Sequence, residues 1–184
     1  MRVISGEIKG KKILEPKDKL TRPLKDLVKE SIFNIIEHSN LFDVNIKNSS
    51  VLDLFSGVGS FGLECLSRGA ASVDFYENYP SVIDVLEKNI KNFKYVEKTS
   101  VIKKDIFFNN MLSSINKKFE IIFIDPPFQK KIMALLELIQ KSDLLEKNGV
   151  IIIHRHKKEA EEFPKDLNIL QTKYYGNSKI FFAN

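Results

Sequence analysis

The sequence predicts a doubly wound α/β domain, in which helices cover both faces of a mainly parallel sheet. From residue 50 onward, short apolar runs alternate with segments of helical spacing, the pattern of consecutive β-α-β units. Two of these runs, 121–124 and 150–153, are continuously apolar, as expected of strands buried on both faces. The chain then ends in two extended stretches joined by a Gly-Asn-Ser turn, which predicts a terminal antiparallel hairpin.

The elements can be assigned in chain order. Residues 2–14 mix β-branched residues with Gly6 and Gly10, which predicts a short β-hairpin. Pro23 suits the first turn of a helix, and apolar residues follow it at helical spacing up to Ile36. Five parallel strands are then expected at 50–55, 72–77, 100–104, 120–125 and 149–154. Helices are expected at about 60–68, 80–93, 106–115 and 130–145, and the final hairpin at 167–175 and 179–183.

Length and composition are those of one globular domain. The chain has 184 residues, of which 43% are apolar and 29% charged, and this excludes a disordered or fibrous protein. It lacks an apolar signal sequence and any apolar run of the ~20 residues that a membrane span needs, so we expect a cytoplasmic protein with no membrane partner. The only cysteine is Cys65, and the three histidines offer no evident ligand set, so we expect neither a disulfide nor a metal. A monomer is expected.

Basic residues are in excess near the N-terminus. The formal net charge is +5, and residues 1–33 contain nine basic and five acidic side chains, whereas 34–184 are nearly balanced. Such a cluster favours contacts with nucleic-acid phosphates. An exposed lysine-rich surface without a binding role is the alternative, because an AT-rich genome also enriches lysine. The candidate nucleic-acid-binding residues are Lys9, Lys11, Lys12, Arg22, Lys25 and Lys29. We therefore expect a hairpin and helix at 1–40 that contact nucleic acid, followed by the α/β domain at 41–184.

The first chemical motif follows the first predicted strand of the sheet. Gly57, Gly59 and Gly62 form a G-x-G-x-x-G turn, which lets a ligand approach the backbone closely. This pattern alone also fits a nicotinamide enzyme. Asp53, four residues before the first glycine, is a poor neighbour for a pyrophosphate but a good one for a cationic amine such as that of S-adenosylmethionine. A tight turn without a ligand is the alternative.

Acidic residues also close the next two strands. Glu77 ends the second strand, where a carboxylate can accept the ribose hydroxyls of an adenosyl cofactor, although it could also be a solvated strand end. Asp105 closes the third strand. Five parallel strands followed by a terminal hairpin resemble the layout of the class I S-adenosylmethionine-dependent methyltransferases, and this resemblance implies that Asp105 receives the adenine amino group while Ile106 packs on the ring. The predicted cofactor-binding residues are Asp53, Ser56, Gly57, Gly59, Glu77, Asn78, Asp105 and Ile106.

The most specific motif is Asp125-Pro126-Pro127-Phe128, which follows an apolar strand. Two prolines cannot continue a central strand, and they fix an extended backbone. The exocyclic amine of a base is nearly non-nucleophilic, so an enzyme must hold its hydrogens with acceptors while a methyl group arrives. The Asp125 carboxylate and the Pro126 carbonyl can be these acceptors, and Phe128 can stack on an unstacked base. We predict these four residues to be catalytic; a simple strand-ending turn is the alternative.

With these motifs the chain resembles the RsmD family of bacterial 16S ribosomal RNA guanine-N2 methyltransferases over nearly its full length. Residues 2–6, 9–13 and 22–34 match the family's blocks R-I-I-G-G, R-G-R-K-L and R-P-T-x-D-R-V-R-E-x-L-F-N. Residues 53–70 match its cofactor block, and 175–178 resemble its closing Y-G-x-T. Departures from the family pattern are Leu24, Leu27, Lys29, Val58, Phe61 and His154, the last standing where the family often has Glu.

The resemblance implies a Rossmann-like, seven-stranded class I methyltransferase that uses S-adenosyl-L-methionine and releases S-adenosyl-L-homocysteine. It implies methylation of the exocyclic N2 of a guanine in 16S rRNA, with free 16S rRNA or the assembling small ribosomal subunit as partner. Three alternatives stay open. One is an amino-methyltransferase of DNA adenine N6 or cytosine N4, which shares D-P-P-[FY]. Another is a non-catalytic rRNA-binding assembly factor, against which the intact motifs argue. The third is a nicotinamide oxidoreductase, which Asp53 and the terminal hairpin disfavour.

Overall fold

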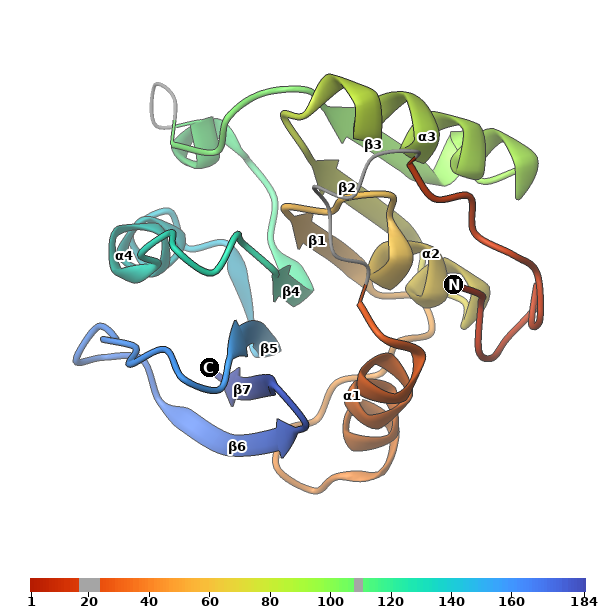
Figure 1. Ribbon diagram of the computed structural model, residues 1–184. Coiled ribbons are helices and arrows are strands. Elements are labelled where there is room, and N and C mark those ends of the chain that lie inside the picture. Colours follow the sequence, from red (N-terminus) through yellow and green to blue (C-terminus); the bar gives the residue numbers. More distant parts are fainter. Residues whose placement is uncertain (17–23, 108–110) are drawn as a thin grey trace.

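The computed structural model describes residues 1–16, 24–107 and 111–184, which form one seven-stranded sheet flanked by helices (Figure 1). The strand order is β3-β2-β1-β4-β5-β7-β6. Strands β1 to β5 pair in parallel, while β7 is antiparallel to both β5 and β6. The predicted five parallel strands and terminal hairpin are therefore confirmed.

The bounds of the strands agree with the apolar runs of the sequence. The strands are β1 (Ser50–Leu54), β2 (Ser72–Tyr76), β3 (Thr99–Ile102), β4 (Phe119–Ile124), β5 (Leu145–His156), β6 (Ile169–Tyr175) and β7 (Ser178–Ala183). The helices of the described residues are α1 (Asp26–His38), α2 (Ser60–Ser67), α3 (Pro80–Asn92) and α4 (Met133–Lys141), with the 3-10 turns η1 (Val96–Lys98) and η2 (Met111–Ser114). Only β5 extends clearly beyond both predicted ends.

The sheet separates two hydrophobic cores. Side chains alternate along a strand, so Ile121 and Phe123 of β4 enter the core shared with α1, α2 and α3, while Ile122 and Ile124 enter the core shared with α4. Every residue of 121–124 is at most 2% exposed, which explains why that run is continuously apolar. Among the described helices, none is long and apolar enough to cross a membrane.

Two predicted elements are wrong. Residues 2–14 do not form two strands, because a single antiparallel bridge joins Arg2 to Lys12 and turns hold the remainder. Of the helix predicted at 106–115, the described part contains only η2, and at residues 105–107 the Asp105 carboxylate accepts the Phe107 N–H in a local turn. Pro23 lies outside the described residues, and α1 is described from Asp26 onward.

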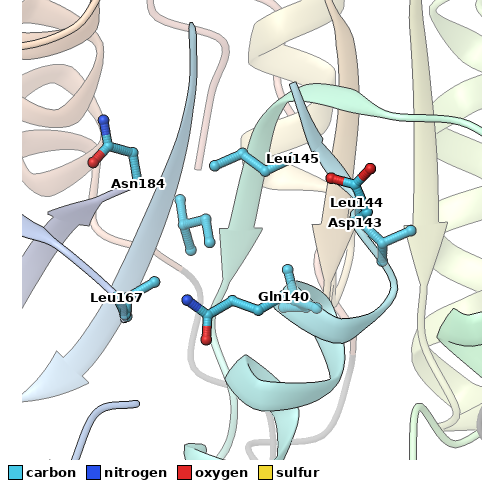
Figure 2. A pocket seen from close by; sticks show the side chains of 8 residues that line it. Gln140, Asp143, Leu144, Leu145, Leu167 and Asn184 are labelled. Carbon is cyan, nitrogen blue, oxygen red and sulfur yellow. The ribbon is translucent and has the colours of Figure 1, made fainter. Parts of the chain in front are cut away.

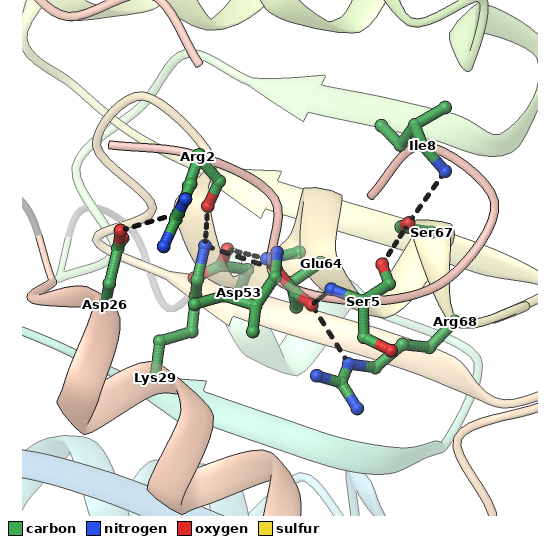
Figure 3. A network of polar contacts seen from close by, with 11 residues as sticks. Arg2, Ser5, Ile8, Asp26, Lys29, Asp53, Glu64, Ser67 and Arg68 are labelled. Atoms are coloured by element: carbon green, nitrogen blue, oxygen red, sulfur yellow. Dashed lines mark hydrogen bonds and ion pairs between the residues drawn. The ribbon is translucent and has the colours of Figure 1, made fainter. Parts of the chain in front are cut away.

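The N-terminal segment, residues 1–16, is anchored to α1 and α2 by the buried carboxylate of Glu64 (Figure 3). One oxygen, Oε2, accepts the Ile4 N–H at 2.8 Å and lies 3.2 Å from Lys29 Nζ. The other, Oε1, accepts the Ser5 N–H at 2.8 Å and Arg68 Nε at 3.0 Å. Four donors thus satisfy a carboxylate that is 0% exposed.

A second anchor connects this segment to the glycine loop. The Asn89 side chain on α3 accepts the Leu14 N–H at 2.8 Å and donates to the carbonyls of Leu14 and Val58 at 3.1 and 3.2 Å. Val3, Ile8, Ile13 and residues of α1 lie in the same core as α2 and α3. The predicted division at residue 40 therefore does not separate two hydrophobic cores.

Candidate functional site

The predicted cofactor residues lie at the carboxyl ends of β1, β2 and β3. Parallel register aligns these ends, because Leu54 pairs with Tyr76 and Tyr76 pairs with Ile102. Backbone bonds continue past the strands: Ser56 N–H donates to Tyr76 O at 3.0 Å, and Glu77 N–H donates to Ile102 O at 3.2 Å. The loops that carry the predicted residues therefore start side by side.

The glycine loop between β1 and α2 needs glycine for two different reasons. Gly57 and Gly59 have φ values of +55° and +84°, where L side chains are strained. A Cβ at Gly59 would lie 2.5 Å from a Leu86 methyl carbon, whereas a Cβ at Gly57 would meet nothing within 4 Å. Gly57 therefore borders open space, which a ligand approaching the backbone requires. A Cβ at Gly62 would lie 2.4 Å from the Phe75 ring, so this glycine allows α2 to pack on the sheet.

Glu77 connects the glycine loop to the start of α3. Its Oε2 accepts the Gly57 N–H at 2.8 Å, and its Oε1 accepts the N–H groups of Asn78 and Tyr79 at 2.9 and 3.0 Å. Asn78 Nδ2 donates in turn to Asp105 Oδ2 at 3.3 Å. Four of the predicted cofactor residues, Gly57, Glu77, Asn78 and Asp105, therefore form one polar chain across the ends of β1, β2 and β3.

Asp53 is buried beneath the glycine loop, at 1% exposure. Its Oδ2 accepts the Gly62 N–H at 3.0 Å. Within the described part of the chain, its Oδ1 and the buried Ser56 Oγ find no hydrogen-bond partner. Burial raises the pKa of Asp53 well above its ordinary value, and the charges of Asp125 and Glu77 raise it further, against the Gly62 hydrogen bond.

These unpartnered atoms test whether the residues fit the expected cofactor. Buried polar atoms are normally satisfied, so two orphans under one open loop indicate a polar group that the protein alone does not supply. A carboxylate oxygen and a hydroxyl are acceptors suited to a cationic amine. The donor set of Asp53 and Ser56 therefore fits the amino-acid end of S-adenosylmethionine.

The D-P-P-F loop leaves β4 beside this cluster. Asp125 N–H donates to Leu54 O at 3.3 Å, so the loop starts next to the end of β1. The chain runs from β1 outward to β2 and β3 and then returns to β4 on the other side of β1. This reversal is the topological switch point, where ligands bind in open α/β sheets. The geometry therefore brings the predicted catalytic loop and the predicted cofactor residues to one place.

Two residues that fix the D-P-P-F loop were not predicted as site residues. Arg155 of β5 is 2% exposed and donates through Nη2 to the carbonyls of Phe128 and Lys130, at 2.8 and 2.9 Å, while its Nε pairs with Glu161. His154, the residue before it, bonds to Asp125 through Nδ1 at 2.7 Å. An arginine two residues after the buried apolar run 150–153 of β5 is the signal that could have found Arg155.

Lys130 connects the D-P-P-F loop to the adenine side of the predicted site. Its Nζ lies 3.9 Å from Asp105 Oδ2 and 5.5 and 4.8 Å from the ring centroids of Phe55 and Phe107. Ile106, in contrast, is only 3% exposed and lies in the core shared with α4. The apolar surface beside the Asp105 carboxylate is therefore provided by Phe55 and Phe107, and an acid next to apolar surface is what the packing of a purine ring requires.

The predicted RNA-binding residues divide into three groups. Lys9, Lys11, Lys12 and Lys25 are exposed, and Arg22 lies outside the described residues. The prediction for Lys29 is wrong, because its side chain is 0% exposed, pairs with Glu64 and donates to Arg2 O at 2.7 Å. Helical spacing places Lys29 on the buried face of α1, three and four residues before Ile32 and Phe33, so the sequence did contain a signal for its burial, although its partner Glu64 lies on another helix.

One cavity of about 190 Å³ lies away from this site (Figure 2). Residues from the end of α4, the start of β5 and the C-terminus line it, among them Gln140, Leu145 and Asn184. Pockets for drug-sized ligands usually measure about 300–1,000 Å³, so this hollow is small for a cofactor. It takes no part in the predicted site.

Comparisons with known proteins agree with this geometry. The family model described as Conserved hypothetical protein 95 matches residues 1–184. The Bacillus subtilis protein YlbH is 36% identical, over 96% of this chain and 94% of its own length. A Buchnera aphidicola protein named ribosomal RNA small subunit methyltransferase D is 31% identical, over 93% of this chain and 86% of its own. An Escherichia coli protein of the same name is 34% identical, over 81% and 68%.

Solved structures support the same fold. The Escherichia coli protein yhhF superposes with a TM-score of 0.83 at 24% identity, covering 100% of this chain and 96% of its own. An RNA methyltransferase from Salinibacter ruber, solved with S-adenosyl-L-homocysteine, gives a TM-score of 0.61 at 12% identity, covering 88% and 92%. These likenesses confirm the predicted Rossmann-like class I methyltransferase fold. The family model spans the whole chain, and relatives above 30% identity are named ribosomal RNA small subunit methyltransferase D. The chain therefore belongs to the RsmD family of rRNA methyltransferases.

Proposed function

We propose that this enzyme transfers the methyl group of S-adenosylmethionine to the exocyclic N2 amine of a guanine in 16S rRNA. The observation that carries the proposal is the position of the D-P-P-F loop, at the switch point between β1 and β4 and beside three strand-end acids. Relatives of this chain bear the name ribosomal RNA small subunit methyltransferase D, which supports the substrate class.

The cofactor is held by the residues at the ends of β1, β2 and β3. Asp53 and Ser56 receive the amino-acid end, and the backbone of Gly57 and Gly59 lies against it. Glu77 accepts the ribose hydroxyls with Asn78 beside it, while Asp105 and Ile106 receive the adenine. When bound, S-adenosylmethionine supplies an electrophilic methyl group on a sulfonium; no metal is invoked.

The acceptor amine is held by the D-P-P-F loop. In the described residues, the carbonyls of Pro127 and Phe128 accept bonds from Arg155, whereas the Pro126 carbonyl accepts none. The Pro126 carbonyl is therefore available to the two amino hydrogens, together with the Asp125 carboxylate. Phe128 stacks on the base, which must leave its own stack to enter. With the cofactor bound, the nitrogen would form a bond to the methyl carbon as the sulfur–carbon bond breaks, S-adenosyl-L-homocysteine would leave, and the proton lost by the nitrogen would pass to solvent.

The exposed lysines of the N-terminal region supply the RNA contacts. Lys9, Lys11 and Lys12 lie on the segment anchored by Glu64, and Lys25 directly precedes α1. Arg22, outside the described residues, remains part of this proposal by its place in the sequence. Neutralising backbone phosphates supplies affinity without sequence information, so these residues would hold the rRNA rather than select the guanine.

The test compares Asp125→Ala with the matched control Asp166→Ala, which removes an exposed acid elsewhere on the molecule. We expect Asp125→Ala to reduce methyl transfer to small-subunit rRNA by at least about 100-fold, since it removes an acceptor that acts in the transition state. Cofactor binding measured by calorimetry should survive. Loss of cofactor binding would place Asp125 in a different role, and transfer at the control's rate would exclude the proposed one.

A further inference from the structure

A line of three side chains runs from the predicted acceptor site to the terminal hairpin. His154 Nδ1 lies 2.7 Å from Asp125 Oδ1, and His154 Nε2 lies 2.8 Å from Ser178 Oγ. The three residues come from the end of β4, from β5 and from the first position of β7. Sheet register brings them together, because Ile124 pairs with Ile153 and the next residue of each strand is Asp125 or His154.

The Asp125 carboxylate determines which groups of this line donate hydrogen bonds and which accept them. An ionised carboxylate only accepts, so the proton between the two groups belongs to His154 Nδ1. In the neutral ring, Nε2 then accepts the hydroxyl proton of Ser178. Both ring nitrogens are occupied, and the side chain is 10% exposed. The imidazole therefore has little freedom to turn away from Asp125.

The same contact leaves the carboxylate with one oxygen for a substrate. Within 1–16, 24–107 and 111–184, Oδ1 of Asp125 accepts from His154, and no hydrogen bond engages Oδ2. A free Asp side chain rotates about χ1 and χ2 and presents either oxygen. Here His154 fixes which oxygen faces β5, and so fixes which one remains for the amine.

We propose that His154, supported by Ser178, is a positioning residue that orients the Asp125 carboxylate so that Oδ2 accepts a hydrogen of the acceptor amine. This inference rests on the proposed function of Asp125. His154 does not touch the reacting atoms; it acts by reducing the number of carboxylate orientations. The terminal hairpin thereby takes part in the reaction geometry through Ser178, although its strands lie at the far side of β5 from the cofactor residues.

The kinetic test uses two substitutions at one position. His154→Leu removes both ring nitrogens, while His154→Asn keeps an N–H donor near the place of Nδ1. Misplacing a reacting group by about 1 Å can cost a factor of about 100, so we expect His154→Leu to lower kcat about 10- to 100-fold, with KM for rRNA and for cofactor unchanged within about twofold. His154→Asn should recover most of kcat. Equal losses in both variants, or an unchanged kcat in His154→Leu, would overturn the proposal.

If His154→Leu does not fold, Ser178→Ala tests the same line from its other end. It removes the support of the imidazole and leaves the Asp125 contact, so we expect a smaller fall in kcat, again without a change in either KM. Thermal unfolding of each variant shows whether it is folded. A fall in Tm with kcat unchanged in Ser178→Ala would assign this line to stability alone.

A spectroscopic measurement separates this inference from the proposed function. The chain has only three histidines, so ¹⁵N-histidine labelling gives signals that His154→Asn assigns. We expect a protonated, hydrogen-bonded Nδ1 at His154 in the wild type and the loss of that bond in Asp125→Ala. An unprotonated Nδ1, or a signal insensitive to Asp125, would overturn the positioning role. A wild-type enzyme that shows this signal but methylates no rRNA would contradict the proposed function instead.

Discussion

The two most deeply buried carboxylates of the described chain are partnered in opposite ways. Glu64, under the N-terminal segment, receives four donors, two of them the cations Lys29 and Arg68. Asp53, under the glycine loop, receives one backbone N–H and keeps an oxygen without a partner. Both are at most 1% exposed. The same chemical group therefore has two roles. The Glu64 carboxylate anchors the N-terminal segment, whereas the Asp53 carboxylate keeps an acceptor oxygen that no group of the described chain uses.

The difference follows from what each region must do. Around Glu64, burial lowers the pKa of Lys29, and the attraction of Glu64 opposes that shift, so the pair is held inside the protein as a unit. Around Asp53, burial raises the pKa with only one hydrogen bond against it. Groups perturbed without compensation cluster at functional sites, where a ligand supplies the missing partner. The comparison supports a structural role for the residues around Glu64 and a ligand-binding role for those around Asp53.

The largest effect on stability is expected from breaking the Glu64 anchor. Glu64→Gln removes the negative charge and leaves Lys29 buried beside Arg68. Breaking a buried ion pair from one side typically costs about 3–5 kcal/mol, so the free energy of unfolding in urea should fall by about that amount. Glu162→Gln, at an exposed position, is the matched control. A fall no larger than the control's would mean that the four contacts do not hold the N-terminal segment.

A smaller effect, on binding, is expected from the lysines that this anchor presents. Replacing Lys9, Lys11 and Lys12 together by Gln should weaken rRNA binding and reduce the slope of log affinity against log salt by about two to three, because each phosphate contact contributes about 0.7–0.9. The control replaces Lys141, Lys147 and Lys165, which are exposed elsewhere. An equal change in slope in both triple variants would show a general effect of net charge instead of an RNA-binding surface.

The smallest change in stability is expected for Asp53→Asn, and it is a gain rather than the loss expected for Glu64→Gln. Its folded-state pKa is raised, so its contribution to stability is present below the unfolded pKa of about 3.9 and is lost as pH rises through the folded pKa. Asp53→Asn keeps an acceptor for Gly62 and removes this titration. As pH rises from the unfolded pKa of Asp53 to its folded pKa, the wild type should therefore lose stability relative to the variant. The variant should also bind cofactor more weakly. Denaturation at several pH values, with calorimetry, tests both; a difference in stability between variant and wild type that does not change with pH would contradict the assignment.

Sequence reasoning worked where the signal is local. Apolar runs such as 121–124 and 150–153 predict buried parallel strands because burial on both faces leaves no polar position. The glycine loop and the D-P-P-F loop were also found from local signals, because glycine and proline mark backbone conformations that other residues rarely adopt. Lys29 was misplaced because its burial depends on Glu64, more than thirty residues away in the chain. Its spacing, three and four residues before the buried Ile32 and Phe33, does indicate the apolar face of α1, but a lysine on that face needs an acidic partner, and this partner lies on another helix.

The support of Asp125 could not be predicted, because it depends on sheet register. His154 is adjacent to Asp125 only when β4 and β5 pair as they do, and Ser178 reaches the ring only because β7 returns antiparallel to β5. The sequence showed that His154 departs from the family pattern, but it did not show that Asp125 and Ser178 are its hydrogen-bond partners. Nor could it reveal that Asp53 keeps one oxygen unpaired, since that requires the neighbours of each atom.

The central claim is tested most directly by identifying the methylated nucleoside. Small-subunit rRNA from cells that lack this gene is incubated with the purified enzyme and isotopically labelled S-adenosylmethionine, then digested and examined by mass spectrometry. We predict the label in N2-methylguanosine, at the nucleoside that is unmethylated in those cells, and its absence with Asp125→Ala. Label in an adenine or cytosine amine, or no transfer to rRNA by the folded enzyme, would contradict the proposed function.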